Sequence, residues 1–312
     1  MSTPEFDAIV VGSGMTGGYA AKELTERGLK VLVLERSRPL EHRQYETEFT
    51  PPWDAKLRGQ LDRDEIARDY PIQSRQPFGQ FKADNKHHWV KDSEQPYVQA
   101  QPYSWIRAGV LGGRSLLWGR QCYRWAPLDF EANKADGHGS DWPIRYRDLV
   151  RWYDRVETYM GISGENLGLA HFPDMKLLPP MQMTAAEKLV RAKIRERWPD
   201  RHLTVGRSAN LTQPHRGRGP CQYRNICQRG CSYGGYFSSL SATLPDAQKT
   251  GRLTVRTDTI VERVVLDEKT GRASGVQVID VKTGERRTHT AKLVFLNAGT
   301  EAVDGQSVVN LE

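Results

Sequence analysis

The residues from Phe6 to Arg36 constrain the fold more than any other part of the chain. A short apolar run is followed at once by Gly12-Ser13-Gly14-Met15-Thr16-Gly17, and a helical pattern then leads to a second apolar run that ends in Glu35. This acid stands 18 residues after the last glycine of the motif. A preceding strand, a following helix and an acid after the next strand make such a glycine motif specific. The stretch therefore predicts a strand–helix–strand unit that binds a dinucleotide.

Each residue type of the motif serves the binding of a diphosphate. Gly12 permits the tight turn out of the strand, Gly14 lets the backbone approach the pyrophosphate, and Gly17 lets the helix pack close to the strand. The free N–H groups at the start of the helix then face the anion. Glu35 can accept hydrogen bonds from ribose hydroxyls and would repel a 2′-phosphate, which favours NAD or FAD over NADP.

Composition and charge argue against several other classes of protein. The chain has 312 residues, enough for two domains, and its formal net charge of +7 is spread over charges of mixed sign. No basic block points to nucleic acid, and no apolar run approaches the ~20 residues of a membrane-spanning helix. The first residues lack the basic and apolar segments of a secretory signal. We therefore expect a cytoplasmic protein, or a periplasmic one if a partner subunit carries it through export.

The rest of the chain alternates between irregular and regular patterns. Residues 38–104 show little periodicity, and so long an irregular stretch predicts an excursion over the nucleotide domain that covers the active site. One helix is expected to begin at Asp141-Trp142-Pro143, and another at the capping box from Thr184 to Glu187. Period-two alternation near the end predicts strands at Leu253–Arg256, Ile260–Leu266, Gly275–Val281 and Lys292–Leu296.

Three further segments carry a resemblance to a known family. Residues 109–119 form a second glycine-rich loop, 141–164 a helical segment, and 295–300 a strand that ends in small residues. In this order, after the first motif, they resemble the glucose–methanol–choline (GMC) oxidoreductases, which are FAD enzymes that oxidise alcohols and sugars. The resemblance implies an α/β fold, with a Rossmann-like FAD-binding domain and an interleaved substrate or cap domain.

The resemblance also implies how the chain is divided. The FAD-binding domain would comprise residues 1–45, 105–135 and 215–312, and the substrate or cap region residues 46–104 and 136–214. The family's catalytic histidine lies beyond the returning strand, so we expect a chain that is truncated at its C-terminal end and lacks the catalytic base. No catalytic residue is assigned. The histidines present are expected to be solvated or structural; they are His42, His87, His88, His138, His171, His202, His215 and His289.

The resemblance adds cofactor-binding residues to those of the first motif. They come from the second glycine loop, from a later strand and from the returning strand, and they are Gly112, Gly113, Ser115, Val261, Ala298 and Gly299. Val261 matches the family position whose backbone contacts the adenine. In the branch with covalently bound flavin, a histidine precedes the tryptophan of the second loop. Because Leu117 stands at that position here, we expect the FAD to be noncovalent.

Three of the four cysteines lie close together with the spacing C-x5-C-x3-C, and they are Cys221, Cys227 and Cys231. Thiolates are the ligands of iron–sulfur clusters. The spacing resembles the segment of gluconate- and glucose-dehydrogenase flavoprotein subunits that holds a 3Fe-4S cluster, and glucoside 3-dehydrogenases have similar sequences here. A disulfide with one spare thiol and three free thiols are the alternatives that the residues leave open.

The resemblance implies a FAD-dependent dehydrogenase of sugars or glycosides. Hydride would pass from a carbinol carbon to flavin N5, and electrons would leave through the cluster to a cytochrome-like acceptor, with a small subunit as a further partner. Two alternatives remain: an oxygen-using sugar oxidase of the same fold, and an inactive fragment that binds FAD or NAD.

Overall fold

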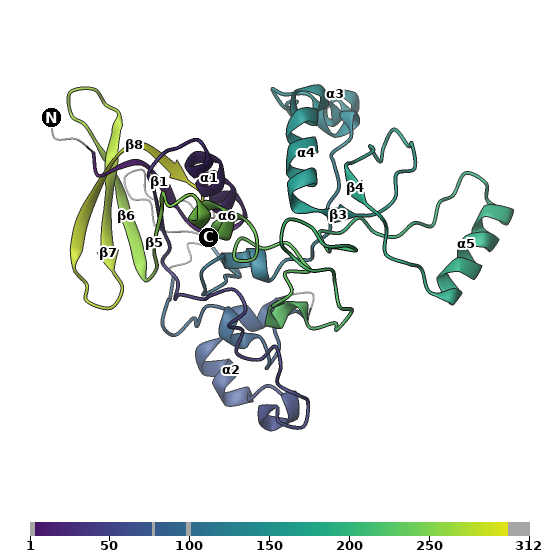
Figure 1. The fold of residues 1–312 in the computed structure, drawn as a ribbon, viewed down its shortest axis with the longest axis horizontal. Coiled ribbons are helices and arrows are strands. Elements are labelled where there is room, and N and C mark those ends of the chain that lie inside the picture. The colour runs from purple at the N-terminus through teal and green to yellow at the C-terminus, as the bar shows by residue number, and fades with distance from the viewer. Residues whose placement is uncertain (1–3, 77–78, 98–100, 299–312) are drawn as a thin grey trace. The chain divides into compact units, whose positions relative to one another are not determined.

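The computed structural model describes residues 4–76, 79–97 and 101–298, and they form two compact units (Figure 1). The first unit takes its described residues from Met1–Trp118, Asn225–Ser232 and Ser238–Glu312, and the second from Gly119–Arg224 and Tyr233–Phe237. By their contacts, the described residues of the segment 46–104 belong to the first unit. Compactness does not tell what a segment binds, so the expected division into FAD-binding and substrate regions stays a prediction.

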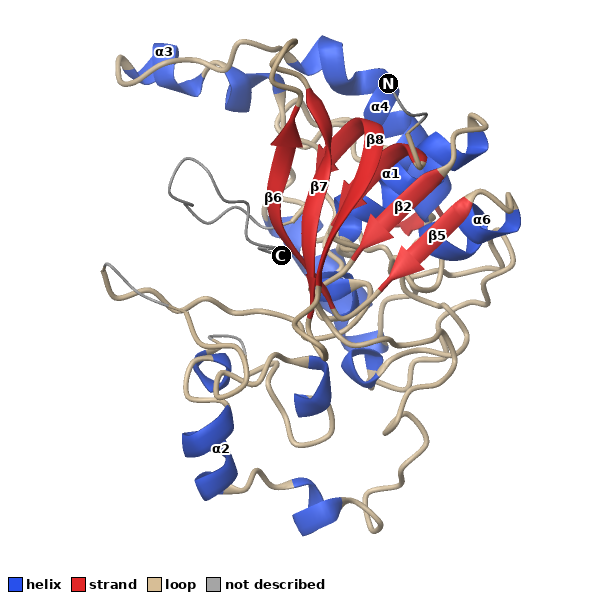
Figure 2. Cartoon of the chain, turned by 90° about the vertical axis from the view of Figure 1, so that its left-hand side faces the viewer, coloured by secondary structure: helices blue, strands red, loops and turns tan. Residues whose placement is uncertain are grey.

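A six-stranded sheet forms the core of the first unit, with the strand order β5-β2-β1-β8-β7-β6. Figure 2 shows β6, β7 and β8 side by side at one end of the sheet and β2 and β5 at the other. The helices and strands of this unit are β1 (Phe6–Val11), α1 (Met15–Glu26), β2 (Val31–Leu34), α2 (Arg63–Asp69), α6 (Thr243–Lys249), β5 (Leu253–Arg256), β6 (Thr259–Leu266), β7 (Ala273–Asp280) and β8 (Arg286–Leu296).

The long strand β8 joins a parallel and an antiparallel part of this sheet. Its second half, from Ala291 to Leu296, pairs in parallel with β1, which in turn pairs in parallel with β2. Its first half, from Arg286 to Thr290, pairs in antiparallel fashion with β7. All four residues of β2 are fully buried, as expected for a parallel strand covered on both faces.

The strand–helix–strand unit predicted from residues 6–36 is confirmed, as are the four later strands. Strand β8 begins at Arg286, earlier than the predicted Lys292, because its first half is mostly polar and shows no apolar alternation. Helix α1 packs against α6 (Figure 1). A Cβ on Gly18 would lie 2.3 Å from Thr243 Oγ1, so the absence of a side chain permits this close approach.

The second unit is mainly helical and contains a parallel pair of short strands. Its elements are α3 (Ala132–Asp136), α4 (Tyr146–Met160), β3 (Ile162–Ser163), β4 (Leu177–Leu178) and α5 (Ala185–Arg197). The predicted start of α5 is confirmed, because Thr184 Oγ1 accepts the N–H of Glu187 at 3.3 Å.

The predicted start of α4 is wrong, because this helix begins at Tyr146 and leaves Pro143 outside. Asp148 accepts the N–H of Arg145 at 2.8 Å and so caps the helix there, while the carboxylate of Asp141 accepts the N–H of Lys134 at 2.8 Å. In the described part of the chain, no helix has both the length and the apolar character needed to cross a membrane.

Candidate functional site

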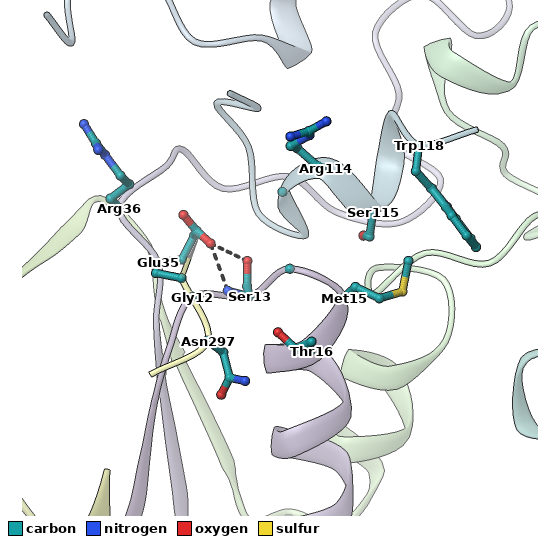
Figure 3. Close-up of a pocket in the computed structure, with 13 residues that line it drawn as sticks. Gly12, Ser13, Met15, Thr16, Glu35, Arg36, Arg114, Ser115, Trp118 and Asn297 are labelled. Carbon is teal, nitrogen blue, oxygen red and sulfur yellow. Dashed lines mark hydrogen bonds between the residues drawn. The ribbon is translucent and has the colours of Figure 1, made fainter. Parts of the chain in front are cut away.

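A cavity of about 380 Å³ opens in the first unit where β1 ends and α1 begins (Figure 3). Its volume lies in the range of roughly 300–1,000 Å³ that is usual for small-molecule sites. Figure 3 shows Glu35 and Arg36 toward one end and Met15 and Trp118 toward the other. The walls come from both glycine loops and from the ends of β2 and β8, and the lining residues are Gly12, Ser13, Gly14, Met15, Thr16, Glu35, Arg36, Gly113, Arg114, Ser115, Trp118, Asn297 and Ala298.

The three glycines of the first loop have different surroundings. Gly12 has a φ of +91°, and a Cβ there would lie 3.1 Å from the backbone N of Ala298. A Cβ on Gly17 would lie only 2.0 Å from the carbonyl oxygen of Gly12. No heavy atom lies within 4 Å of the Cβ position of Gly14. Helix α1 has neither a side-chain cap nor an acidic residue in its first turn, so its first N–H groups can receive an anion.

Glu35 lies at the end of β2 with 3% of its surface exposed. Its Oε2 accepts the N–H of Ser13 at 3.1 Å and the hydroxyl of Ser13 at 2.5 Å, as Figure 3 shows. Its Oε1 accepts the N–H of Ser37 at 3.0 Å. Since each carboxylate oxygen has two lone pairs, Oε1 keeps one position for a donor such as a ribose hydroxyl.

Hydrogen bonds bring the second glycine loop beside the first. The N–H of Gly112 donates to the hydroxyl oxygen of Ser13 at 2.8 Å, and the hydroxyl of Ser115 donates to the carbonyl oxygen of Gly112 at 2.6 Å. Gly112 has a φ of +91°, which favours glycine. Gly113 and Ser115 border the cavity, whereas Gly112 connects the loops from outside its lining.

The returning strand closes the cavity from the side of β1. The N–H of Asn297 donates to the carbonyl oxygen of Val11 at 2.9 Å, and Ala298 follows at the cavity wall. The side-chain oxygen Oδ1 of Asn297 is buried and has no hydrogen-bond partner among the described residues. Val261 does not border the cavity; its side chain is fully buried in the core, and its predicted backbone contact with adenine stays a prediction. Gly299 lies outside the described residues.

Comparison with known proteins decides the family. The GMC oxidoreductase family model matches residues 6–303 of the chain. The protein belongs to the GMC oxidoreductases. This membership confirms the resemblance inferred from the sequence, and it implies FAD as the cofactor.

The chain is similar to several characterised GMC proteins. It is 27% identical over 314 residues to 2-methyl-1,2-propanediol dehydrogenase from Mycolicibacterium austroafricanum, covering 95% of this chain and 49% of that protein. Identity with the fructose dehydrogenase large subunit of Gluconobacter japonicus is 26%, covering 78% of this chain and 44% of that one. Identity with the gluconate 2-dehydrogenase flavoprotein of Pantoea cypripedii is also 26%, covering 94% of this chain and 50% of that protein. The chain thus spans about half the length of these relatives.

The residues around the cavity fit the FAD that the GMC family implies. Gly12, Gly14 and Gly17 form a cradle that side chains would fill or distort. The buried oxygen of Asn297 at the wall lacks a donor among the described residues. The single acid of the lining, Glu35, already accepts three hydrogen bonds, and two arginines also line the cavity. The wall can therefore receive a diphosphate.

Sequence reasoning missed seven of the residues that line this GMC cavity. They are Ser13, Met15, Thr16, Arg36, Arg114, Trp118 and Asn297. Each lies next to or between residues of the recognised motifs, and this position in the sequence is the signal that could have identified it. The bond from Gly112 to Ser13 joins positions 99 residues apart, and no local pattern announces it.

The three predicted cluster cysteines belong to different parts of the chain. Cys227 and Cys231 lie in the first unit and Cys221 in the second. Where the structure describes the chain, its cysteines form no disulfide. No set of three or more His, Cys, Asp or Glu side chains in the described ranges is placed to hold a metal ion. The cluster therefore stays a prediction.

The segment from Asn225 to Ser232 is held firmly against the rest of the first unit. The carboxylate of Glu48, 3% exposed, accepts the N–H of Ser232 at 2.9 Å and also its hydroxyl. Gly230 has a φ of +111°, and a Cβ there would lie 2.1 Å from the ring of Tyr45. Burial raises the pKa of the Tyr45 phenol, which keeps it neutral beside Glu48. This segment is therefore a fixed part of the first unit.

Two adjacent histidines of the first unit are in ring contact, with centroids 4.2 Å apart; His88 is fully buried and His87 is half-buried. Burial lowers the pKa of His88 to about 3 and that of His87 to about 4, so both rings are neutral at pH 7. Nδ1 of His88 lies 3.1 Å from the carbonyl oxygen of Gln228 and donates to it. Neither ring borders the cavity, and the solvated or structural role expected for these histidines stays a prediction.

Proposed function

We propose that this chain provides the FAD-binding part of a dehydrogenase that oxidises a CH–OH group of a sugar or glycoside. The observation that carries the proposal is the cavity between the two glycine loops, with Glu35 at one end and the open start of α1 beside it. Fructose dehydrogenase and gluconate 2-dehydrogenase among the relatives support a sugar-type substrate. Leu117, buried in the core, supports noncovalent binding, since leucine cannot form a flavin link.

The lining suggests how the cofactor would lie. The ribose of the adenosine part would donate to the remaining acceptor position on Oε1 of Glu35. The pyrophosphate would lie against the backbone of Gly14 and the first N–H groups of α1, where the helix dipole favours negative charge. The flavin part would extend toward Met15 and Trp118, which Figure 3 shows away from Glu35.

When bound, FAD would accept the hydride that leaves the carbinol carbon of the substrate. The chain's own residues would bind and orient the cofactor, and no residue of this chain is assigned as the base that takes the hydroxyl proton. We further propose that electrons pass to a cytochrome-like acceptor, with a small subunit as a partner. In this proposal Cys221, Cys227 and Cys231 would hold a 3Fe-4S cluster, which would supply one-electron transfer.

Titration of the purified chain with FAD tests the proposal. The wild type should bind FAD, with NAD binding much more weakly when titrated in parallel. Gly14→Val should abolish FAD binding, because its side chain would occupy the space reserved for the pyrophosphate. Gly119→Val is the matched control, because the Cβ position of Gly119 also has no heavy atom within 4 Å but lies outside the cavity lining. Equal FAD affinity in the wild type and Gly14→Val would refute the proposed site.

The reaction itself requires a second measurement. Flavin reduction by a panel of glucosides and sugars is followed by stopped-flow absorbance, and it should be slow because no residue of this chain is assigned as the base. The flavin is therefore also reduced chemically, and its reoxidation by an artificial acceptor or by oxygen is followed. Reoxidation by the artificial acceptor and slow reoxidation by oxygen are expected for a dehydrogenase. Rapid reoxidation by oxygen would favour a sugar oxidase instead.

A further inference from the structure

The first glycine loop is connected to the second through one buried hydroxyl. Ser13, fully buried, donates to Glu35 and accepts from the N–H of Gly112 at 2.8 Å. The Ser13 hydroxyl oxygen thus holds two groups in place: the carboxylate of Glu35 at the end of β2, and the N–H of Gly112 in the second loop. Removing it would leave the Gly112 N–H without its buried acceptor.

The second loop is in turn connected to the chain segment that precedes α6. Ser115, 2% exposed, donates its hydroxyl to the carbonyl oxygen of Gly112 at 2.6 Å. The oxygen of that hydroxyl accepts the N–H of Ser239 at 3.0 Å. Ser115 therefore uses its hydroxyl both as a donor and as an acceptor, as Ser13 does.

The segment before α6 returns to the first loop. The hydroxyl of Ser239, itself fully buried, donates to the carbonyl oxygen of Gly14 at 2.8 Å. Since Gly14 is the chain neighbour of Ser13, the connections form a closed ring. The ring passes from Ser13 through Gly112, Ser115 and Ser239 to Gly14, and it joins three segments that are far apart in the sequence.

We propose that Ser13, Ser115 and Ser239 are positioning residues that hold the two glycine loops at the spacing required by the pyrophosphate of the cofactor. The inference rests on the proposed function, because it assigns FAD to the cavity. Buried hydrogen bonds in a connected set support one another, so opening the ring at one point should weaken the whole. The two glycine loops would then sample other spacings. Cofactor binding would have to restore the original spacing, which would lower the affinity.

A double-mutant cycle between Ser13→Ala and Ser239→Ala tests the ring. The cycle is measured twice on the full chain: in urea unfolding without cofactor, and in the Kd for FAD and for ADP. Each single variant should weaken FAD and ADP binding roughly five- to tenfold, because Ser13→Ala removes two buried hydrogen bonds and Ser239→Ala removes one. The double variant should lose little more than the weaker-binding single variant, because either change opens the same ring.

Two further variants serve as controls. Ser238→Ala removes a buried hydroxyl whose hydrogen bonds stay within its own turn, with Ser241. Combined with Ser13→Ala, it should show independent effects in both measurements. Ser13→Thr keeps the hydroxyl at a position that borders the cavity, and it should retain most of the affinity for FAD and ADP. This variant keeps the proposal testable if Ser13→Ala does not fold.

The outcomes separate the ring from the proposed function. Independent effects of Ser13→Ala and Ser239→Ala in unfolding would show that the ring does not exist. If Ser13→Ala and Ser239→Ala are coupled in unfolding but act independently on FAD and ADP binding, the ring exists and its positioning role is overturned. If the wild type binds neither FAD nor ADP while the unfolding cycle shows coupling, the ring stands, and the proposed function and the positioning role both fail.

Discussion

Nε of Arg229 lies 2.7 Å from Oδ2 of Asp84, and this ion pair joins positions 145 residues apart. Arg229 stands between Cys227 and Cys231, and it also donates to the carbonyl oxygen of Thr50 at 3.2 Å. The two charged side chains are 21% and 26% exposed, so water screens the pair only in part. The cysteine segment is therefore attached to the irregular stretch after β2 by a charge pair as well as by the Glu48–Ser232 contact.

Asp84→Ala should destabilise the chain by about 1–2 kcal/mol, because it leaves a half-buried guanidinium without its carboxylate. It should also raise the alkylation rate of Cys227 and Cys231 as their segment loosens. Urea unfolding and mass-spectrometric thiol labelling measure the two effects. Glu94→Ala is the control: the Lys91–Glu94 pair is 2.9 Å long but 42% and 66% exposed, so its loss should cost less than about 0.5 kcal/mol. Equal effects of the two variants would contradict the prediction.

Gly17→Ala and Gly14→Ala should separate folding from binding. The new Cβ at position 17 would lie 2.0 Å from the backbone oxygen of Gly12, which cannot move without distorting the loop. We expect a loss of about 2 kcal/mol or more in the free energy of unfolding, together with loss of FAD binding. Gly14 has open space at its Cβ, so Gly14→Ala should change stability by less than about 1 kcal/mol and still weaken FAD. A stable, FAD-binding Gly17→Ala variant would argue against this loop geometry.

The parts of the fold that could be predicted from the sequence are those with local signals. The run from Phe6 to Glu35 carries its own strand, turn and helix pattern, and the capping box at Thr184 marks a helix start within four residues. The start of α4 was misplaced because Asp141 and Asp148 are both plausible caps. Only tertiary contacts show that the backbone N–H of Lys134 engages the first of them.

The cavity was predicted in part for a similar reason. The spacing of the motif predicts Gly12, Gly14 and Glu35 as binding residues, and all three line the cavity. Ser13 occupies a variable position of the motif, and its importance depends on Gly112, which the chain brings to it from 99 residues away. Ser239 belongs to no recognised motif, so its contact with Gly14 becomes visible only in three dimensions.

The contact pair of half-buried His87 and fully buried His88 should make the stability of the chain sensitive to mild acid. The folded-state pKa values of His87 and His88, about 4 and about 3, lie below the ordinary histidine value of 6.5. Between pH 6.5 and the folded-state pKa values, the unfolded chain binds protons that the folded chain does not. The free energy of unfolding therefore falls as the pH falls below 6.5. Each imidazole should contribute about 1 kcal/mol per pH unit near pH 5.5. Charged groups near the pair are Arg38, Glu46, Asp84 and Lys86.

His88→Asn tests this pH dependence because asparagine can still donate to the Gln228 carbonyl but does not titrate. The slope of unfolding free energy against pH, measured by urea unfolding from pH 7 to 5, should fall to roughly half. His138→Asn, at an exposed position, should leave the slope unchanged. An unaltered slope in His88→Asn would mean that carboxylates elsewhere cause the acid sensitivity.

The cysteine segment should bind iron and sulfide on anaerobic reconstitution. Cys227 and Cys231 lie on a segment that Arg229 and Ser232 attach to the first unit, so two of the three proposed ligands are already held in place. Cys122 is the matched control: it stands outside the C-x5-C-x3-C run, and burial raises its thiol pKa to about 12, which disfavours the thiolate near pH 8. Cys227→Ser should therefore lose iron and acid-labile sulfide together, whereas Cys122→Ser should retain both. If well-folded wild-type protein contains neither after reconstitution, the three thiols do not hold a cluster, and electrons must leave the flavin by another route.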